Sequence, residues 1–194
     1  ALLYQFNANE NKIFSGTMQI VTQSFLYTRY RPLAYYTGYV DSRELQAQVN
    51  LTSFMKILLV KRLESSFHAF RLTIDRFIST YESVIKAYKN GHVYISKKYA
   101  PKIFELLGMD DYAAIDQYIQ DDKAIKYDAK DFKPTFIRDL KRDLTVLKGI
   151  RDDWATVTRD PKWEKFAEEL KKDKHLKKSK LIIFTESKET AEYL

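Results

Sequence analysis

Basic and hydroxyl side chains gather at two places in this sequence where they could contact phosphate groups. The first is the pair Lys61 and Arg62, which follows an apolar stretch and precedes two serines. The second is a lysine cluster near the C-terminus that includes Lys177 and Lys178. Such side chains commonly bind nucleic-acid phosphates without reading the bases. A net charge of +7 and a pI near 9.3 agree with an acidic partner, most often nucleic acid.

Each of these groups also has a purely structural explanation. Lys61 and Arg62 would complement the dipole at the end of one helix, with a serine of the pair 65–66 as the cap of the next helix. Ser187 would likewise cap a helix that begins at Lys188. Residues 171–180 hold seven Lys or His among ten, a run that is typical of a solvated surface. Both interpretations stay open at the level of the sequence.

Several kinds of chemistry are excluded by residue type and spacing. The chain has no cysteine, so it forms no disulfide and no thiolate site. Its closest two glycines are 17 residues apart, which leaves neither GxxxxGK[ST] nor GxGxxG to cradle a nucleotide. His68, His92 and His175 lie far apart, and the adjacent aspartate pairs fall in helical patterns. We therefore expect no catalytic site, metal site or cofactor site in this chain.

The spacing of apolar residues predicts a mainly helical fold. A helical pattern runs from Phe14 to Thr28, and residues 32–38 have no clear period and are predicted to form a loop. A second helix begins after an N-cap at Asp41 or Ser42 and continues to Leu63.

Two long helices form the clearest pair. From Phe67 to Tyr88 the apolar residues alternate steps of three and four, a period of 3.5 that is typical of packing along a partner helix. Residues 136–157 repeat this pattern and are the natural partner. We therefore predict a long antiparallel helical hairpin or bundle, with Gly91 ending the first helix and a short extended segment over 92–96.

The remaining elements are shorter. Helices are predicted over 101–107, over 110–126 and from Pro161, with Asp160 as the N-cap of the last.

The C-terminal residues have a different character. The apolar run 181–185 is typical of a strand buried on both faces of a parallel sheet, and a helix from Lys188 would turn Ala191 and Leu194 inward. Because one strand and one helix cannot bury such a strand, we expect these residues to open a further α/β domain, of which this chain holds only the start.

Two segments resemble one protein family. Residues 56–66 (KILLVKRLESS), followed by Ala69 and Phe70, and residues 180–194 (KLIIFTESKETAEYL) resemble bacterial superfamily II helicases of the Swi/Snf type. The second segment is similar to the opening strand, loop and helix of the second RecA-like lobe, the motif IV region. The first is similar to the basic segment ahead of a helical insertion. The phosphate-binding loop, the acidic metal-binding box and the arginine-finger motif of that family are missing here.

The resemblance implies a domain organisation and a role. Residues 1–40 would follow the first ATPase lobe, residues 41–175 would form a helical insertion, and residues 176–194 would begin the second lobe with a terminal βα unit. The chain would be a non-catalytic segment that couples lobe motion and contacts the DNA backbone. Because Thr185, Ser187 and Lys188 match the motif IV loop, the resemblance implies that these three residues make backbone contacts. DNA and the flanking RecA-like lobes are the implied partners, while ATP and magnesium would bind to the longer protein.

A second function remains open, namely a stand-alone helical adaptor that binds protein through the 67–88 face. The predicted strand argues against it, because an adaptor gains nothing from an unpaired strand. No apolar run approaches the 18 residues of a membrane span, no secretory leader pattern opens the chain and cysteine is absent. We therefore expect a cytoplasmic protein that does not bind membranes.

Overall fold

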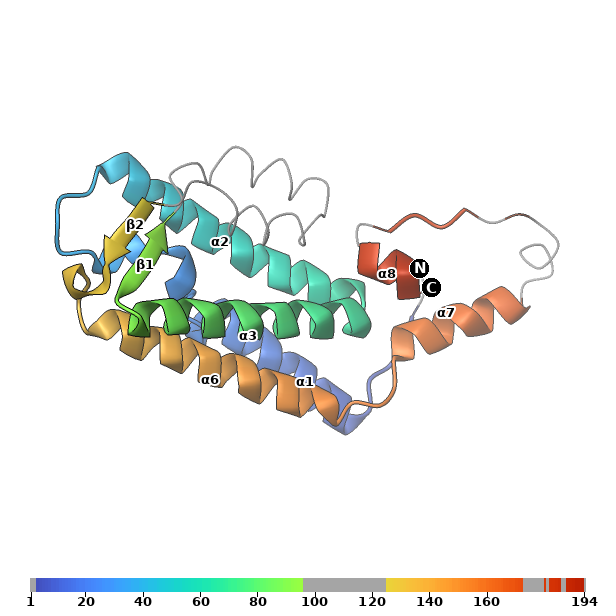
Figure 1. Cartoon of the computed structure of the whole chain (residues 1–194). Helices are drawn as coiled ribbons and strands as arrows, with labels where there is room; N and C mark the ends of the chain where they lie inside the picture. Colours follow the sequence, from blue (N-terminus) through green and yellow to red (C-terminus); the bar gives the residue numbers. More distant parts are fainter. Residues whose placement is uncertain (1–2, 96–124, 173–179, 181, 186–187, 194) are drawn as a thin grey trace.

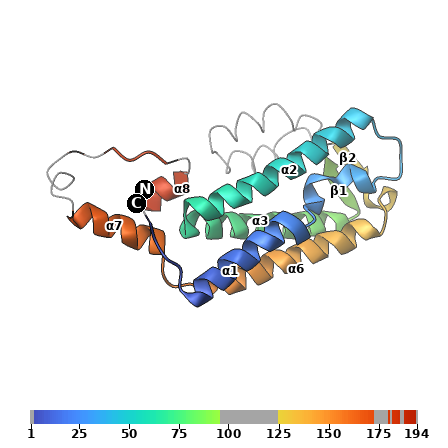
Figure 2. The same ribbon diagram turned by 180° about the vertical axis from the view of Figure 1, so that it is seen from behind.

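A computed structural model describes residues 3–95, 125–172, 180, 182–185 and 188–193. In this part of the chain the fold is mainly helical, as predicted, with one small antiparallel sheet. Figure 1 shows helices α1, α2, α3 and α6 side by side, with α7 and α8 at one end and strands β1 and β2 at the other; Figure 2 shows the same bundle from behind. The elements are α1 (Ala8–Gln19), α2 (Ser42–Ser65), α3 (Phe67–Lys89), β1 (His92–Ile95), β2 (Ile125–Asp128), α6 (Thr135–Ala155), α7 (Pro161–Lys172) and α8 (Lys188–Tyr193).

The two long heptad helices, α3 and α6, pack antiparallel as predicted. Phe70 near the start of α3 lies against Trp154 near the end of α6, with ring centroids 5.3 Å apart. Midway along the pair, the Tyr81 hydroxyl donates to Asp143 over 3.0 Å. Later residues of α3 therefore contact earlier residues of α6, which is the antiparallel order. The four side chains in these contacts are fully buried. The pair is therefore the centre of the hydrophobic core.

The helix ends follow the capping chemistry expected from the sequence. Asp41 accepts a hydrogen bond from the Arg43 amide at the start of α2, and Ser66 accepts one from the Ala69 amide at the start of α3. Ser66 alone separates the two helices, so α2 folds back on α3 as a hairpin. Gly91 has φ = 87°, the left-handed conformation that ends α3 as predicted.

The first helix ends earlier than predicted. Its last turn, Ile20–Ser24, is a π-helix, and the chain then leaves the helix instead of continuing to Thr28. The reason is a tertiary contact, because Asp143 on α6 accepts hydrogen bonds from the amides of Leu26 and Thr28. Within residues 32–38, which were predicted to form a loop, Pro32–Tyr35 is a 3-10 turn, and a second short 3-10 turn, Thr28–Tyr30, precedes it.

Other parts of the prediction need correction. The extended segment predicted after Gly91 is confirmed as strand β1, but its partner β2 includes Ile125 and Lys126, so the helix predicted over 110–126 does not extend through these two residues. The helix predicted over 101–107, and most of that over 110–126, lie outside the described residues.

The C-terminal strand is also not confirmed. Residues 182–185 have no regular secondary structure, and a strand without a neighbouring strand has no partner for its backbone groups. Helix α8 begins at Lys188 as predicted, but Ala191 is exposed, whereas Glu189 and Thr190 are buried. Polar partners on α2 and α3, described below, draw these two side chains inward instead.

Candidate functional site

The two segments that carry the family resemblance meet at the junction of α2, α3 and α8. Arg62, in the last turn of α2, donates from Nη1 to Oε2 of Glu189 on α8 over 2.9 Å. Close by, the hydroxyl oxygens of Ser65 and Thr190 are 3.1 Å apart and share a hydrogen bond. The residues of the first pair are 127 positions apart in the sequence. We call this set of contacts the α8 junction.

A second arginine completes the ionic centre of the junction. Nη1 of Arg76 on α3 lies 2.5 Å from Oε1 of Glu189, so that one carboxylate holds two guanidinium groups. Arg62 is only 2% exposed and the Glu189 side chain 8%, while the Arg76 side chain is partly open to solvent. Arg62 and Arg76 come from different helices, so Glu189 ties α8 to both members of the α2–α3 hairpin.

The two arginines favour the ionised form of Glu189. Burial raises the pKa of this carboxyl group, because it disfavours the charged form. The hydrogen bond from Arg76 and the positive charges of Arg62 and Arg76 act in the opposite direction and outweigh burial, so the pKa lies below its usual value. Removing one partner of a buried ion pair leaves an uncompensated charge, which makes this contact sensitive to mutation.

Helix α7 closes another side of the junction. Asp160 caps α7 by accepting from the Trp163 amide, and Pro161 opens the helix, as the sequence predicts. At the second residue of α7, Nζ of Lys162 donates to the backbone carbonyls of Glu64 and Ser65, at 2.9 and 3.0 Å. This lysine binds the C-terminal carbonyls of α2, where a positive charge is favourable.

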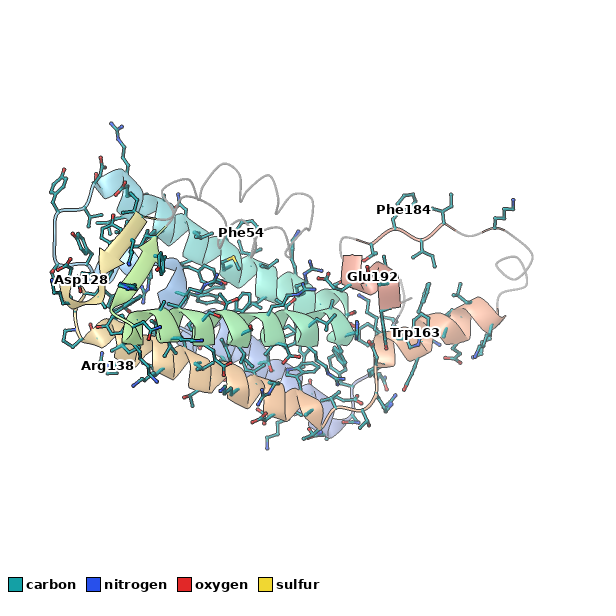
Figure 3. The ribbon with its side chains drawn as sticks, in the orientation of Figure 1. Phe54, Asp128, Arg138, Trp163, Phe184 and Glu192 are labelled. Atoms are coloured by element: carbon teal, nitrogen blue, oxygen red, sulfur yellow. The ribbon has the colours of Figure 1, made fainter. Side chains whose placement is uncertain are left out.

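Aromatic side chains fill the space between these helices, as Figure 3 shows for Trp163. His68 stacks on Tyr193 with ring centroids 4.8 Å apart, and Tyr193 in turn lies 5.7 Å from Trp163. His68 is therefore a packing residue at this contact. A pocket of about 190 Å³ opens here and is lined by Ser65, Ser66, Asp160, Lys162, Trp163, Phe166, Phe184, Thr185, Thr190 and Tyr193.

The predicted phosphate contacts occupy different positions. Lys61 is exposed, whereas its neighbour Arg62 is buried against α8. Thr185 is half-buried and lines the pocket, and Lys188 is the first residue of α8. Ser187, Lys177 and Lys178 lie outside the described residues.

Next to Thr185 the chain presents apolar side chains to solvent. Ile182 is 80% exposed, Phe184 is 90% exposed, and Ile183 between them is about half exposed. Figure 3 shows Phe184 on the segment that passes beyond α8, away from the bundle. Three consecutive apolar residues in this state form a surface that is normally covered by another part of a protein.

Sequence reasoning missed Arg76 and Glu189. Arg76 lies beside the apolar heptad stripe of α3, and Glu189 lies in the first turn of α8, where an acidic residue favours the helix dipole on its own. Nothing in the sequence pairs two residues that are 113 positions apart. A covarying pair in an alignment would have been the only sequence-level sign of the contact.

Within the described ranges, no group of three or more His, Cys, Asp or Glu side chains is arranged to hold a metal ion. None of the helices in those ranges is long and apolar enough to cross a membrane. Comparisons of the chain with protein-family models, curated proteins and solved structures give no match.

Proposed function

We propose that this chain is the non-catalytic helical segment between the two RecA-like lobes of an ATP-dependent DNA helicase or translocase of the Swi/Snf type. The observation that carries this proposal is the Arg62–Glu189 contact. It joins residues 56–66 to residues 180–194, the two segments that resemble the family, across 127 positions of sequence. Coupling requires a contact through which a movement of the second lobe reaches the helical insertion, and the buried ion pair between α2 and α8 is such a contact.

The coupling follows from the way α8 is held. In the proposed protein α8 belongs to the second lobe, and Glu189 fixes it to α2 and α3 together. A displacement of that lobe would pull on two long helices that are packed into one core, and they would move as a rigid unit. Arg62 thus acts in coupling rather than in DNA binding.

The exposed segment 182–184 supports the same proposal. Its apolar side chains match those of a strand that is buried on both faces, and such strands occur inside parallel sheets covered by helices. In the longer protein the second lobe would supply that sheet. ATP and magnesium would bind to the lobes, and DNA would contact Lys61, Lys177, Lys178, Thr185, Ser187 and Lys188 through its backbone.

The first test is genetic. The coding sequence on both sides of these 194 residues should encode a phosphate-binding loop and an acidic metal-binding box before them, and an arginine-finger motif after them. Flanking sequences without these motifs would contradict the proposal. So would DNA-stimulated ATP hydrolysis by the 194-residue chain alone.

The second test addresses coupling in the longer protein. Glu189→Gln keeps the shape of the side chain but removes its charge, so we expect DNA-stimulated ATP hydrolysis to fall about tenfold, within the usual range of coupling energies. The DNA-free rate should stay nearly unchanged. Asp75→Asn is the matched control, because it also neutralises one carboxylate and Asp75 is an exposed acid next to Arg76 on α3. Equal rates for both variants would contradict a coupling role for Glu189.

The third test addresses DNA contact at Lys188. Lys188→Glu should weaken DNA binding and reduce the dependence of the affinity on salt by at least one released counterion. DNA-free ATP hydrolysis should remain nearly intact. Unchanged affinity and salt dependence would assign Lys188 to the solvated surface.

A helical adaptor is the second candidate, and the exposed side chains of Ile182, Ile183 and Phe184 favour it over a free-standing enzyme. An adaptor would use this apolar segment, or the 67–88 face, to bind a protein partner. Capture of a purified partner that is lost in Phe184→Ser, by a chain that does not bind DNA, would favour the adaptor.

A further inference from the structure

A row of lysines follows the outer flank of the α3–α6 pair at the end remote from α8. The flank is defined by an ion pair, in which Nζ of Lys148 on α6 lies 2.6 Å from Oε1 of Glu82 on α3. Lys86 and Lys89 follow Glu82 by one and two turns on α3, and Lys141 precedes Lys148 by two turns on α6. Because the helices are antiparallel, Lys86 and Lys89 on α3 and Lys141 on α6 all lie on the same side of this ion pair, toward the end of the bundle that is remote from α8.

Lys133 extends the row beyond the start of α6. It is fixed there by its backbone, since its amide donates to the Tyr35 carbonyl over 2.9 Å. The side chains of Lys86, Lys89, Lys133 and Lys141 are all exposed, and none of them has an acidic partner among the described residues. We call these four residues the basic row.

The surroundings of the basic row are also positive. Residues 86–90 and 133–142 hold six cations, the four lysines of the row with Arg138 and Arg142, against one acid. That acid, Asp139, is buried, accepts a hydrogen bond from the Tyr35 hydroxyl and pairs with Arg138 over 3.1 Å, so it neutralises Arg138 but none of the four lysines. Figure 3 shows Arg138 near the start of α6, at the end of the molecule opposite to Trp163 on α7 and Glu192 on α8.

We infer that the basic row binds the phosphodiester backbone of duplex nucleic acid. Lys141 follows Lys133 by eight positions, about 12 Å at the helical rise of about 1.5 Å per residue, which spans about three to four phosphates of one strand. Unpaired cations in a line match a polyanion whose charges are regularly spaced. The two stretches that carry the row have no exposed aromatic side chain, so they lack the stacking platform that a single strand requires.

This contact goes beyond the proposed function, which places nucleic acid only near residues 61 and 177–188. His68, which touches α8, and Lys89 are 21 residues apart on α3, a distance of about 30 Å. The bundle would then be attached to a moving lobe at one end and to nucleic acid at the other, and the two helices would act as a lever between them.

The test uses the 194-residue chain and a labelled DNA duplex of about 20 base pairs, with affinity measured against salt concentration. Lys89→Gln/Lys141→Gln removes two charges of the row, so the logarithmic salt slope should decrease in magnitude by about two. At about 0.1 M salt the affinity should fall about tenfold. Lys89→Arg/Lys141→Arg should retain both the slope and the affinity, because it keeps the charges.

The matched control is Lys12→Gln/Arg151→Gln, which changes the net charge equally at exposed sites outside the row. Equal losses in this control and in the row variant, or no DNA binding by the unmutated chain, would overturn the inference. If the variant Lys89→Gln/Lys141→Gln lost binding to phosphatidylserine vesicles but kept its affinity for DNA, the inference would be overturned in favour of a membrane surface.

The outcome is distinguishable from that of the proposed function. If Lys188→Glu weakens DNA binding and the row variant does not, the inference fails while the C-terminal contacts stand. If only the row variant weakens binding, the inference stands and the contact proposed at Lys188 fails.

Discussion

The bundle core and the α8 junction are held together by different kinds of interaction. Between α3 and α6 the contacts are made by side chains that are almost completely buried, such as Phe70, Leu140 and Leu147. At the junction the helices are joined by Arg62, Glu189 and hydroxyl groups, around a pocket, and the apolar side chains of α7 are only half-buried. Apolar burial is non-directional, whereas ionic contacts depend on geometry and charge.

This difference suggests a division of labour. A close-packed core resists deformation, so the bundle keeps its shape when force is applied to it. A junction made of a few polar contacts can open locally without unfolding the core. The chain carries one tryptophan in each region, Trp154 in the core and Trp163 at the junction, so the two regions can be followed separately.

The largest effect is expected from Trp154→Ala. Trp154 is 1% exposed, packs against Phe67 and Phe70, and donates from Nε1 to Oγ1 of Thr17 over 2.8 Å. Its removal leaves a cavity between three helices and should lower the free energy of unfolding by about 4 kcal/mol. Urea denaturation followed by circular dichroism measures this loss.

Trp163→Ala is the companion variant in the other region. Trp163 is half-buried and lines the pocket, so its loss should lower the global free energy of unfolding by at most about 1 kcal/mol. Equal losses for Trp154→Ala and Trp163→Ala would show that core and junction unfold as one unit, and the comparison would then break down.

The next effect concerns the polar centre of the core. Asp143 is buried and accepts hydrogen bonds from the amides of Leu26 and Thr28 and from the Tyr81 hydroxyl. Asp143→Ala leaves these three donors without their acceptor, so the free energy of unfolding should fall by about 3 kcal/mol. Asp152→Ala, at an exposed carboxylate of the same helix, should change it by about 0.5 kcal/mol or less. A similar small loss in both variants would contradict a structural role for Asp143.

The core was largely predictable from the sequence because its rules are local or periodic. The 3.5-residue repeat over Phe67 to Tyr88 indicated both the helix and its antiparallel partner, and the caps at Asp41, Ser66 and Asp160 follow from side-chain chemistry within three residues. Gly91 likewise ends α3 through its own backbone preference. These features do not depend on any distant part of the chain.

The features that were missed depend on distant residues. The helix before Phe25 stops because Asp143, 117 residues further on, takes up the Leu26 amide. Glu189 turns inward because Arg62 and Arg76 are there to receive it, and its own sequence neighbours predicted Ala191 in that place. The strand over 181–185 was predicted from composition alone, yet strand formation requires a partner strand. A tertiary contact overrides a local preference in each of these cases.

The smallest effect on global stability, and the sharpest test of the comparison, is acidification. The pKa of Glu189 is lowered in the folded chain by its two arginines, so its stabilising contribution is complete above the unfolded value of about 4.5 and is lost as the pH falls through the folded pKa. The pKa of Asp143 is raised, chiefly by burial, so its protonation stabilises the folded core as the pH falls through that raised pKa. Below about pH 4.5 the junction should therefore loosen while this site in the core does not.

The measurement is the fluorescence of Trp163 in the variant Trp154→Phe, recorded from pH 7 to pH 3 beside the far-ultraviolet circular dichroism. Because Trp163 lies against Tyr193 of α8, its emission should change in the acid range before the helical signal falls. Glu164 and Glu168 on α7 also have lowered pKa values and titrate there, so Trp154→Phe/Glu189→Gln is measured in parallel. With an uncharged side chain at position 189, the junction should already be loosened at pH 7, and the acid transition should be reduced. If the transition is the same with and without Glu189, the ion pair does not hold α8, and the junction would have to depend on the aromatic contacts of Tyr193 instead.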